Sequence, residues 1–190
     1  MRMAQELSLL FNSTIAFFLA LLFVRAALHK LGDRYRFQGI LADYGLLPEQ
    51  TLGLAAAAIP VLELGASVLL ILPSMRPVGA ALAGILLSAY AIAMAISLLR
   101  GRYLIDCGCG GAPEPISWLL VARNGLLTAL IVPTAARFAG SATGRLAEDA
   151  AALAMAVLLI LLWLVAEAVF SNSRRMNEGL PSPVITWSVS

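Results

Sequence analysis

Five long apolar stretches run through this chain, and they limit the folds it can adopt more than any other feature. Crossing the hydrocarbon core of a bilayer takes about 20 helical residues at 1.5 Å each. Inside that core, a helix is the open structure that satisfies its own backbone hydrogen bonds. The stretches that are long enough cover residues 7–29, 52–72, 77–99, 116–138 and 147–170.

The composition agrees with a membrane environment. Hydrophobic residues make up 61% of the 190 residues and charged residues only 13%, whereas soluble domains carry roughly a quarter charged residues. The net charge of +2 is too small to indicate a nucleic-acid partner. We therefore predict an all-α integral membrane helical bundle that contacts the lipid bilayer.

The spans and the segments between them predict one domain. Residues 1–170 form the transmembrane domain, and residues 171–190 form a polar, flexible tail. Residues 33–50, between the first two spans, repeat apolar side chains at intervals of three and four. This pattern predicts a short amphipathic helix in the membrane interface.

The chain has only two cysteines, Cys107 and Cys109, one residue apart in the loop after the third span. A disulfide between them would close almost no loop, so it would stabilise the fold little by restricting the unfolded chain. Gly108 permits the tight turn that such a bond needs, and Gly110 keeps the loop open to an incoming thiolate. A strained bond of this kind exchanges readily. We therefore favour a redox pair over two free thiols without a role.

The charges near the cysteines act in opposite directions, and a metal site is the rival interpretation. Asp106 disfavours a thiolate at the neighbouring position, whereas Arg100 and Arg102 favour one. The two cysteines and His29 supply three soft ligands, but the fourth position of a tetrahedral site stays empty. We predict no metal.

Ionisable residues also lie within the apolar spans. Glu63, in the middle of the second span, costs roughly 2.5–3.5 kcal/mol unless it is protonated or paired. We expect Arg123, which Asn124 follows in the fourth span, to be its partner, with Arg25 as a second candidate. The sequence leaves open whether this group locks the bundle or handles protons or a ligand.

A cluster of basic residues lies at the end of the first span. Arg25 and His29 are four residues apart and so share a helix face, and Lys30 lies at the membrane boundary. His29 could give a proton to a reacting thiol or a hydrogen bond to a quinone oxygen. Glu167, near the end of the fifth span, is expected to face the lipid headgroups.

The side of the membrane that the cysteine loop faces is contested. Seven basic residues lie on the side of this loop and four on the opposite side, so the positive-inside rule favours a cytoplasmic loop. A disulfide persists better outside the cytosol. The residues alone do not decide between these arguments.

Several motifs in order resemble the methylamine utilisation protein MauE family. They are "AALHKLGD", "LADYGLLP", "IPVLELGA", "LLRGRYLIDCGCGG" and "ISWLLVARN", between Ala26 and Asn124. The resemblance implies a four-helix core like that of the DoxX-like membrane proteins, to which this chain adds a fifth transmembrane helix and the short interfacial helix.

The resemblance also implies a function and partners. The family is associated with maturation of the small subunit of methylamine dehydrogenase, a periplasmic protein with many disulfides. The implied partner is a membrane-anchored, thioredoxin-like protein of the MauD type, whose C-x-x-C pair would exchange with Cys107 and Cys109. This places the protein in the bacterial inner membrane, with the cysteine loop in the periplasm.

Three hypotheses follow. The first is a thiol–disulfide redox component, whose electrons pass to a quinone or between protein partners in a direction that the sequence leaves open. The second is a non-catalytic scaffold for the thioredoxin-like partner. The third is a DoxX-like protein that binds a quinone or another small molecule through Arg25, Glu63 and Arg123. Only the first would be an enzyme, a thiol–disulfide oxidoreductase.

Overall fold

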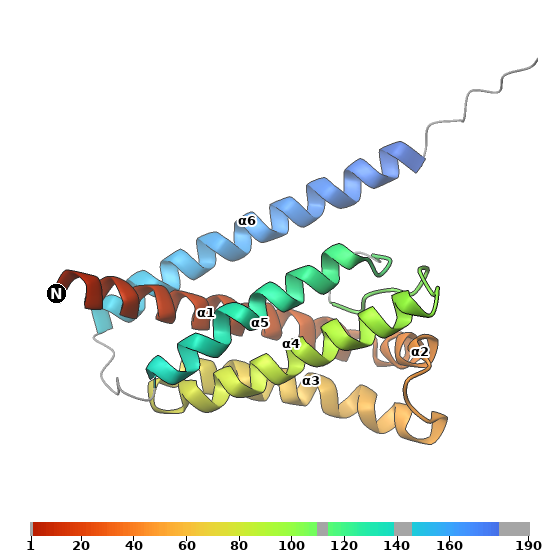
Figure 1. Ribbon diagram of the computed structural model, residues 1–190, viewed down its shortest axis with the longest axis horizontal. Helices are drawn as coiled ribbons and strands as arrows, with labels where there is room; N and C mark the ends of the chain where they lie inside the picture. The colour runs from red at the N-terminus through yellow and green to blue at the C-terminus, as the bar shows by residue number, and fades with distance from the viewer. Residues whose placement is uncertain (1, 110–113, 139–145, 179–190) are drawn as a thin grey trace, which may run out of the picture.

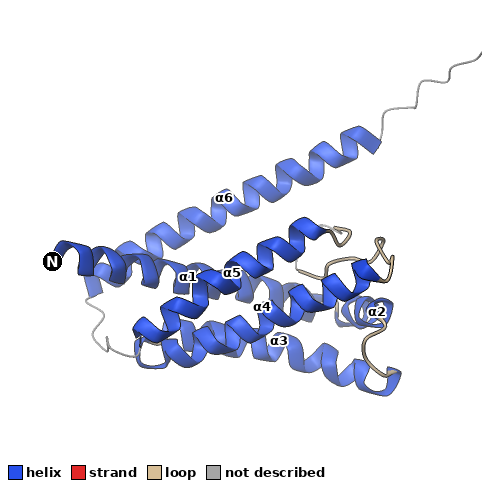
Figure 2. Ribbon diagram, viewed as in Figure 1, coloured by secondary structure: helices blue, strands red, loops and turns tan. Residues whose placement is uncertain are grey.

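The computed structural model describes residues 2–109, 114–138 and 146–178. These residues form six α-helices and no strand (Figure 2). The all-α fold predicted from the sequence is confirmed. The helices are α1 (Arg2–Gly32), α2 (Arg34–Tyr44), α3 (Glu49–Ile71), α4 (Arg76–Leu99), α5 (Trp118–Phe138) and α6 (Leu146–Glu178), with a 3-10 turn, η1 (Pro73–Met75), between α3 and α4.

Four segments of the described helices are long and apolar enough to cross a membrane. They are Glu6–Gly32, Glu49–Ile71, Pro73–Leu99 and Asp149–Val169. The apolar part of α5 in the described residues, Trp118–Ile131, is shorter, so the fourth predicted span, residues 116–138, stays a prediction.

Helix α6 is longer than the sequence predicted. It continues to Glu178, into the segment that was predicted to be a flexible tail. Residues 171–178 contain neither glycine nor proline, so nothing in them breaks the helix that the apolar span begins. The remainder of the predicted tail lies outside the described residues.

Helices α1, α3, α4 and α5 form a bundle, and α6 packs along α1 and diverges from the bundle toward its C-terminal end (Figure 1). Small residues permit the close packing. A Cβ atom on Gly79 of α4 would lie 2.6 Å from the backbone nitrogen of Leu70 in α3, so the two helix backbones touch there. The main buried cluster includes Ala16, Ala20, Phe23, Ala66, Leu70, Ala80, Ala83 and Leu87.

Helix α2 closes one end of the bundle. Its N-cap is Asp33, whose carboxylate accepts a hydrogen bond from the amide of Arg36 at 3.0 Å. It ends at Gly45, in the left-handed conformation usual for a helix C-terminus. The predicted short helix between the first two spans is therefore present. The C-terminus of α1, helix α2 and the cysteine loop all lie at this end (Figure 1).

Candidate functional site

The two cysteines are joined. Cys107 and Cys109 form a disulfide with their Cα atoms 5.3 Å apart, in the loop between α4 and α5. Gly108 between them has a φ of +68°, a conformation that side chains other than glycine rarely adopt. A Cβ atom there would lie 3.4 Å from a methyl group of Ile40 and 3.6 Å from the ring of Phe37. The turn that carries the disulfide therefore packs directly on α2.

Asp106 organises this loop. Its Oδ1 atom accepts hydrogen bonds from the amides of Gly108 at 3.3 Å and Glu114 at 3.4 Å. Its Oδ2 atom pairs with Arg36 Nη2 of α2 at 2.8 Å. The amide of Cys107 donates to the carbonyl of Glu114 at 2.9 Å. One carboxylate thus holds the turn, the far side of the loop and α2 together.

A second apolar cluster packs against the cysteine loop. Cys107 packs against it, and the ring of Tyr44 is buried within it. Burial, together with the negative charge of Asp106, raises the pKa of Tyr44 well above its ordinary value. The Tyr44 hydroxyl consequently stays protonated and adds no charge beside the disulfide. The other buried members of this cluster are Ile40, Met94, Leu98, Ile105, Ile116 and Leu120.

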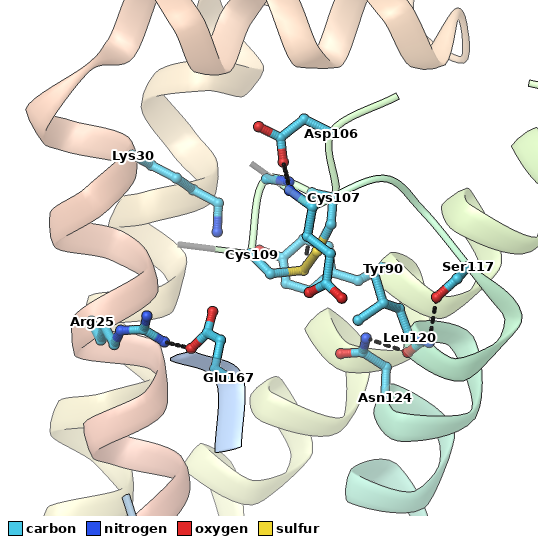
Figure 3. The surroundings of a disulfide bond; sticks show 12 residues. Arg25, Lys30, Tyr90, Asp106, Cys107, Cys109, Ser117, Leu120, Asn124 and Glu167 are labelled. Atoms are coloured by element: carbon cyan, nitrogen blue, oxygen red, sulfur yellow. Dashed lines mark hydrogen bonds and ion pairs between the residues drawn. A yellow bond between two sulfur atoms is a disulfide. The ribbon is translucent and has the colours of Figure 1, made fainter. Parts of the chain in front are cut away.

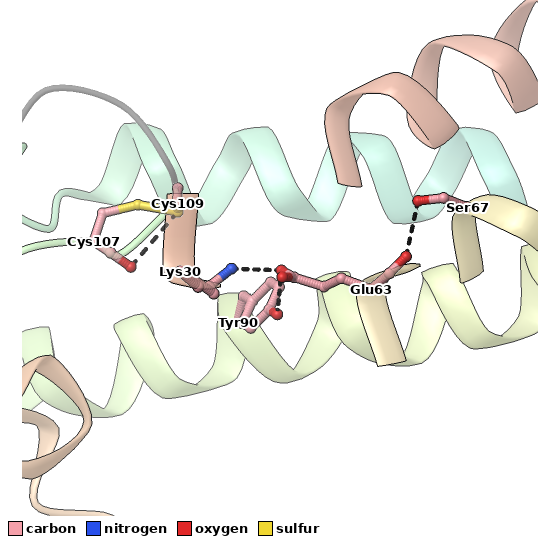
Figure 4. Close-up of polar contacts among 6 residues, drawn as sticks. All are labelled: Lys30, Glu63, Ser67, Tyr90, Cys107 and Cys109. Atoms are coloured by element: carbon pink, nitrogen blue, oxygen red, sulfur yellow. Dashed lines mark hydrogen bonds and ion pairs between the residues drawn. A yellow bond between two sulfur atoms is a disulfide. The ribbon is translucent and has the colours of Figure 1, made fainter. Parts of the chain in front are cut away.

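A buried polar group lies deeper in the bundle. Lys30 Nζ of α1 contacts Glu63 Oε1 of α3 at 2.5 Å, and the side chains are 3% and 0% exposed. The Tyr90 hydroxyl of α4 donates to the same oxygen at 2.7 Å. The Lys30 ammonium also lies 5.2 Å from the centre of the Tyr90 ring and 5.3 Å from that of Phe37. Figure 4 shows Lys30 between the disulfide and Glu63.

The predicted partners of Glu63 are wrong. Arg25 pairs instead with Glu167 of α6 at 2.9 Å, so Glu167 does not simply face the headgroups (Figure 3). The Arg123 guanidinium lies over the ring of Trp163 at 5.2 Å. The sequence gives the depth of each residue along its helix, but not the rotation of that helix in the bundle. This rotation turns Lys30 toward Glu63.

The remaining predicted residues have simpler positions. Asn124 is buried and donates from Nδ2 to the carbonyl of Leu120 at 2.9 Å, one turn back on α5. His29 is exposed on α1. Gly110 lies outside the described residues. The described part of the chain brings no group of three or more His, Cys, Asp and Glu side chains together as metal ligands.

A cavity of about 320 Å³ connects these features. Every predicted site residue that the structure describes lines it: Arg25, His29, Lys30, Glu63, Asp106, Cys107, Gly108, Cys109, Arg123 and Asn124.

Sequence reasoning missed several residues of the same cavity. Tyr90, Phe37, Arg36, Trp163 and Glu167 also line it. Tyr90 was the easiest to find, because its hydroxyl stands within a predicted span and needs a hydrogen-bond partner there. The contribution of α2 and α6 depends on packing that the sequence does not display.

Fold and site together define a class: an all-helical membrane protein that carries a disulfide at one end of its bundle, beside a partly polar cavity. The family model described as "Methylamine utilisation protein MauE" matches residues 8–137. The chain belongs to this family.

Individual relatives agree with this assignment, and all three described here carry the name Methylamine utilization protein MauE. The protein from Paracoccus denitrificans is 40% identical over 151 residues, covering 78% of this chain and 81% of the relative. The protein from Paracoccus versutus is 36% identical, over 87% of this chain and 86% of the relative. The protein from Methylophilus methylotrophus is 34% identical, over 79% of this chain and 80% of the relative. No solved structure matches the chain significantly.

Proposed function

We propose that this protein is a thiol–disulfide redox component of the bacterial inner membrane. Cys107 and Cys109 exchange with a membrane-anchored, thioredoxin-like partner of the MauD type. That partner acts on a periplasmic client with many disulfides, such as the small subunit of methylamine dehydrogenase. The family membership supports the link to methylamine utilisation.

The observation that carries the proposal is the bond between the chain's only two cysteines. It spans a single residue, so it restricts the unfolded chain very little and is a poor structural staple. Both cysteines are half-buried, and they lie at an end of the bundle rather than among the spans. These features suit a bond that an external thiolate opens.

The exchange is balanced in atoms and electrons. One thiolate of the partner attacks a sulfur of the Cys107–Cys109 bond and forms a mixed disulfide while the other cysteine leaves as a thiolate. The second thiol of the partner then attacks that mixed disulfide. The partner ends as a disulfide, and Cys107 and Cys109 end as two thiols that hold the two electrons.

The test is client maturation in a methylamine-using bacterium that lacks its own copy of this protein. We expect the double variant Cys107→Ser/Cys109→Ser to reach normal membrane levels but to leave the client short of disulfides. The control Ala81→Ser, on an exposed position of α4, should mature the client normally. Normal maturation in the double variant would overturn the redox proposal and favour a scaffold that only docks the partner.

A further inference from the structure

The two electrons gained in that exchange must leave the protein before it can act again. The chain contains no second cysteine pair that could receive them. An acceptor must therefore reach Cys107 and Cys109 from outside the chain. The cavity that these two residues line is the space in which the structure can hold one. This inference rests on the function proposed above.

The size and charge of the cavity indicate the kind of molecule that fits. Its volume of about 320 Å³ lies within the range of roughly 300–1,000 Å³ typical of small-molecule sites. Its lining is mainly apolar, and its charges nearly cancel. The basic residues are Arg25, Lys30, Arg36 and Arg123, and the acidic residues are Asp33, Glu63, Asp106, Glu114 and Glu167. This lining favours an uncharged, largely apolar ligand over an anion or a cation.

Buried polar atoms at the cavity are left with unused hydrogen-bonding capacity. Lys30 has three N–H donors, and Glu63 takes one of them. Glu63 Oε2 and Arg123 Nε are buried without a hydrogen-bond partner among the described residues. Buried polar atoms are usually satisfied, so these atoms point to a ligand that carries oxygen. A carbonyl oxygen would accept from Lys30 or Arg123, and a ring hydroxyl would donate to Glu63.

The cavity is bounded on one side by α6, which packs mainly on α1. Trp163 and Glu167 of α6 line it, yet α6 packs along α1 and diverges from α5 (Figure 1). Most of the described large apolar side chains of α6 between Leu153 and Val169 are exposed and would contact lipid. A ligand dissolved in the bilayer can thus approach between α6 and α5, with a hydrocarbon tail left in the lipid.

From these observations we infer that the cavity binds a lipid-soluble quinone, which oxidises the reduced Cys107–Cys109 pair. Two S–H bonds break and one S–S bond forms. The two electrons and two protons pass to the quinone, whose two oxygens become hydroxyls. The Lys30 ammonium stabilises the negative charge that develops on the nearer quinone oxygen. The protein therefore works as an oxidant that recharges its thioredoxin-like partner.

The test uses the full-length protein in lipid nanodiscs without oxygen. The disulfide is reduced, the reductant is removed, and decylubiquinone or a menaquinone with a short prenyl tail is added as the probe. We expect one quinol to form for each pair of thiols lost, measured by quinone absorbance and by mass labelling of free thiols. The two probes distinguish a benzoquinone site from a naphthoquinone site, and reduction of either one supports the inference.

A cavity-filling variant locates the reaction. Ala93 lines the cavity and, like Cys107, packs against the second apolar cluster. We expect Ala93→Leu to slow quinone reduction by about tenfold or more. The matched control is Ala81→Leu, the same change at an exposed position on the same helix, which should react like the wild type. If Ala93→Leu fails to fold, Ala26→Leu narrows the cavity from α1.

A parallel measurement separates the two proposals. The oxidised protein is mixed with a reduced thioredoxin-like protein in the absence of quinone. Exchange without quinone reduction by either probe would overturn the quinone inference alone. Failure of the exchange would overturn the proposed function. Quinone reduction that is equal in Ala93→Leu and Ala81→Leu would contradict the placement of the quinone in this cavity.

Discussion

Lys30 and Glu63 form an ion pair inside the bundle, joining the end of α1 to the middle of α3. The ring of Phe37 lies between this pair and the disulfide in the chain of contacts, because its centre is 5.3 Å from the Lys30 ammonium and a Cβ atom on Gly108 would lie 3.6 Å from the ring. This buried ion pair is thus placed beside the cysteine loop.

Removing one partner of this pair should destabilise the protein strongly. Lys30→Met leaves the Glu63 carboxylate buried without its countercharge, which we expect to cost about 3–5 kcal/mol. The double variant Lys30→Met/Glu63→Gln removes both charges and should recover most of that loss. Thermal unfolding in detergent micelles measures the stability of the single and the double variant.

The pair between Arg25 and Glu167 provides the control. Its side chains are 32% and 24% exposed, whereas those of Lys30 and Glu63 are 3% and 0% exposed, so Arg25→Met should lower stability less than Lys30→Met does. Equal losses for Lys30→Met and Arg25→Met would contradict the buried position of the Lys30–Glu63 pair.

Gly108 should set how readily the disulfide forms. Its positive φ makes alanine unfavourable by about 1–2 kcal/mol, although a Cβ atom would make only an ordinary contact with Ile40. The dithiol form is free to relax, so Gly108→Ala should raise the reduction potential of the pair by about 20–40 mV. Equilibration with a glutathione series measures this shift.

Gly101 is the matched control for this substitution. It also has a positive φ, of 75°, but no atom lies within 4 Å of its Cβ position and it stands apart from the disulfide. Gly101→Ala should lower stability and leave the potential unchanged. A shift of the potential of similar size in both variants would exclude a local effect of Gly108 on the bond.

Replacing Asp106 should destabilise the cysteine loop more than removing only its ion pair with Arg36. Asp106→Ala removes the acceptor for the amides of Gly108 and Glu114, and we expect a loss of about 1–3 kcal/mol in local stability. Arg36→Met removes only a half-exposed pair and should cost at most about 1 kcal/mol. Hydrogen exchange at these two amides is the measurement, and equal exchange rates in both variants would contradict this role of Asp106.

Much of the fold followed from the sequence because the bilayer imposes simple rules. The length of an apolar stretch predicts a helix, and the spacing of Phe37 and Ile40 predicted the short helix that became α2. The pairing of Cys107 with Cys109 as candidate redox partners and the turn at Gly108 followed from local spacing, whereas the sequence left open whether the bond is formed. Four of the five predicted spans match long apolar helices, whereas the apolar part of α5 in the described residues is short.

The pairing of the buried charges did not follow, because it depends on helix rotation. Lys30 is five residues after Arg25, so it points about 140° away around the helix axis. Arg25 consequently meets Glu167 of α6, and Lys30 meets Glu63 of α3. The hydropathy of the sequence does not indicate how each helix is rotated about its axis.

The cysteine loop is proposed to lie in the periplasm, and this position predicts that it is accessible from outside the cell. After mild reduction of intact cells, a membrane-impermeant maleimide should label Cys107 and Cys109. A control places one cysteine in the loop between α3 and α4, with Ser74→Cys in a background without the native pair. It should be labelled only after the membrane is breached. The reverse pattern would put the cysteine loop in the cytoplasm.

The central claim is that this disulfide exchanges with a protein partner, and trapping the mixed disulfide tests it most directly. Cys107 packs against buried residues and its amide is bonded to Glu114, so we expect the partner to attack Cys109. Cys107→Ser should therefore accumulate a covalent complex with a C-x-x-C protein that disappears on reduction. The double variant Cys107→Ser/Cys109→Ser should form none. If neither single variant, Cys107→Ser nor Cys109→Ser, forms such a complex in cells that are maturing the client, the account is contradicted.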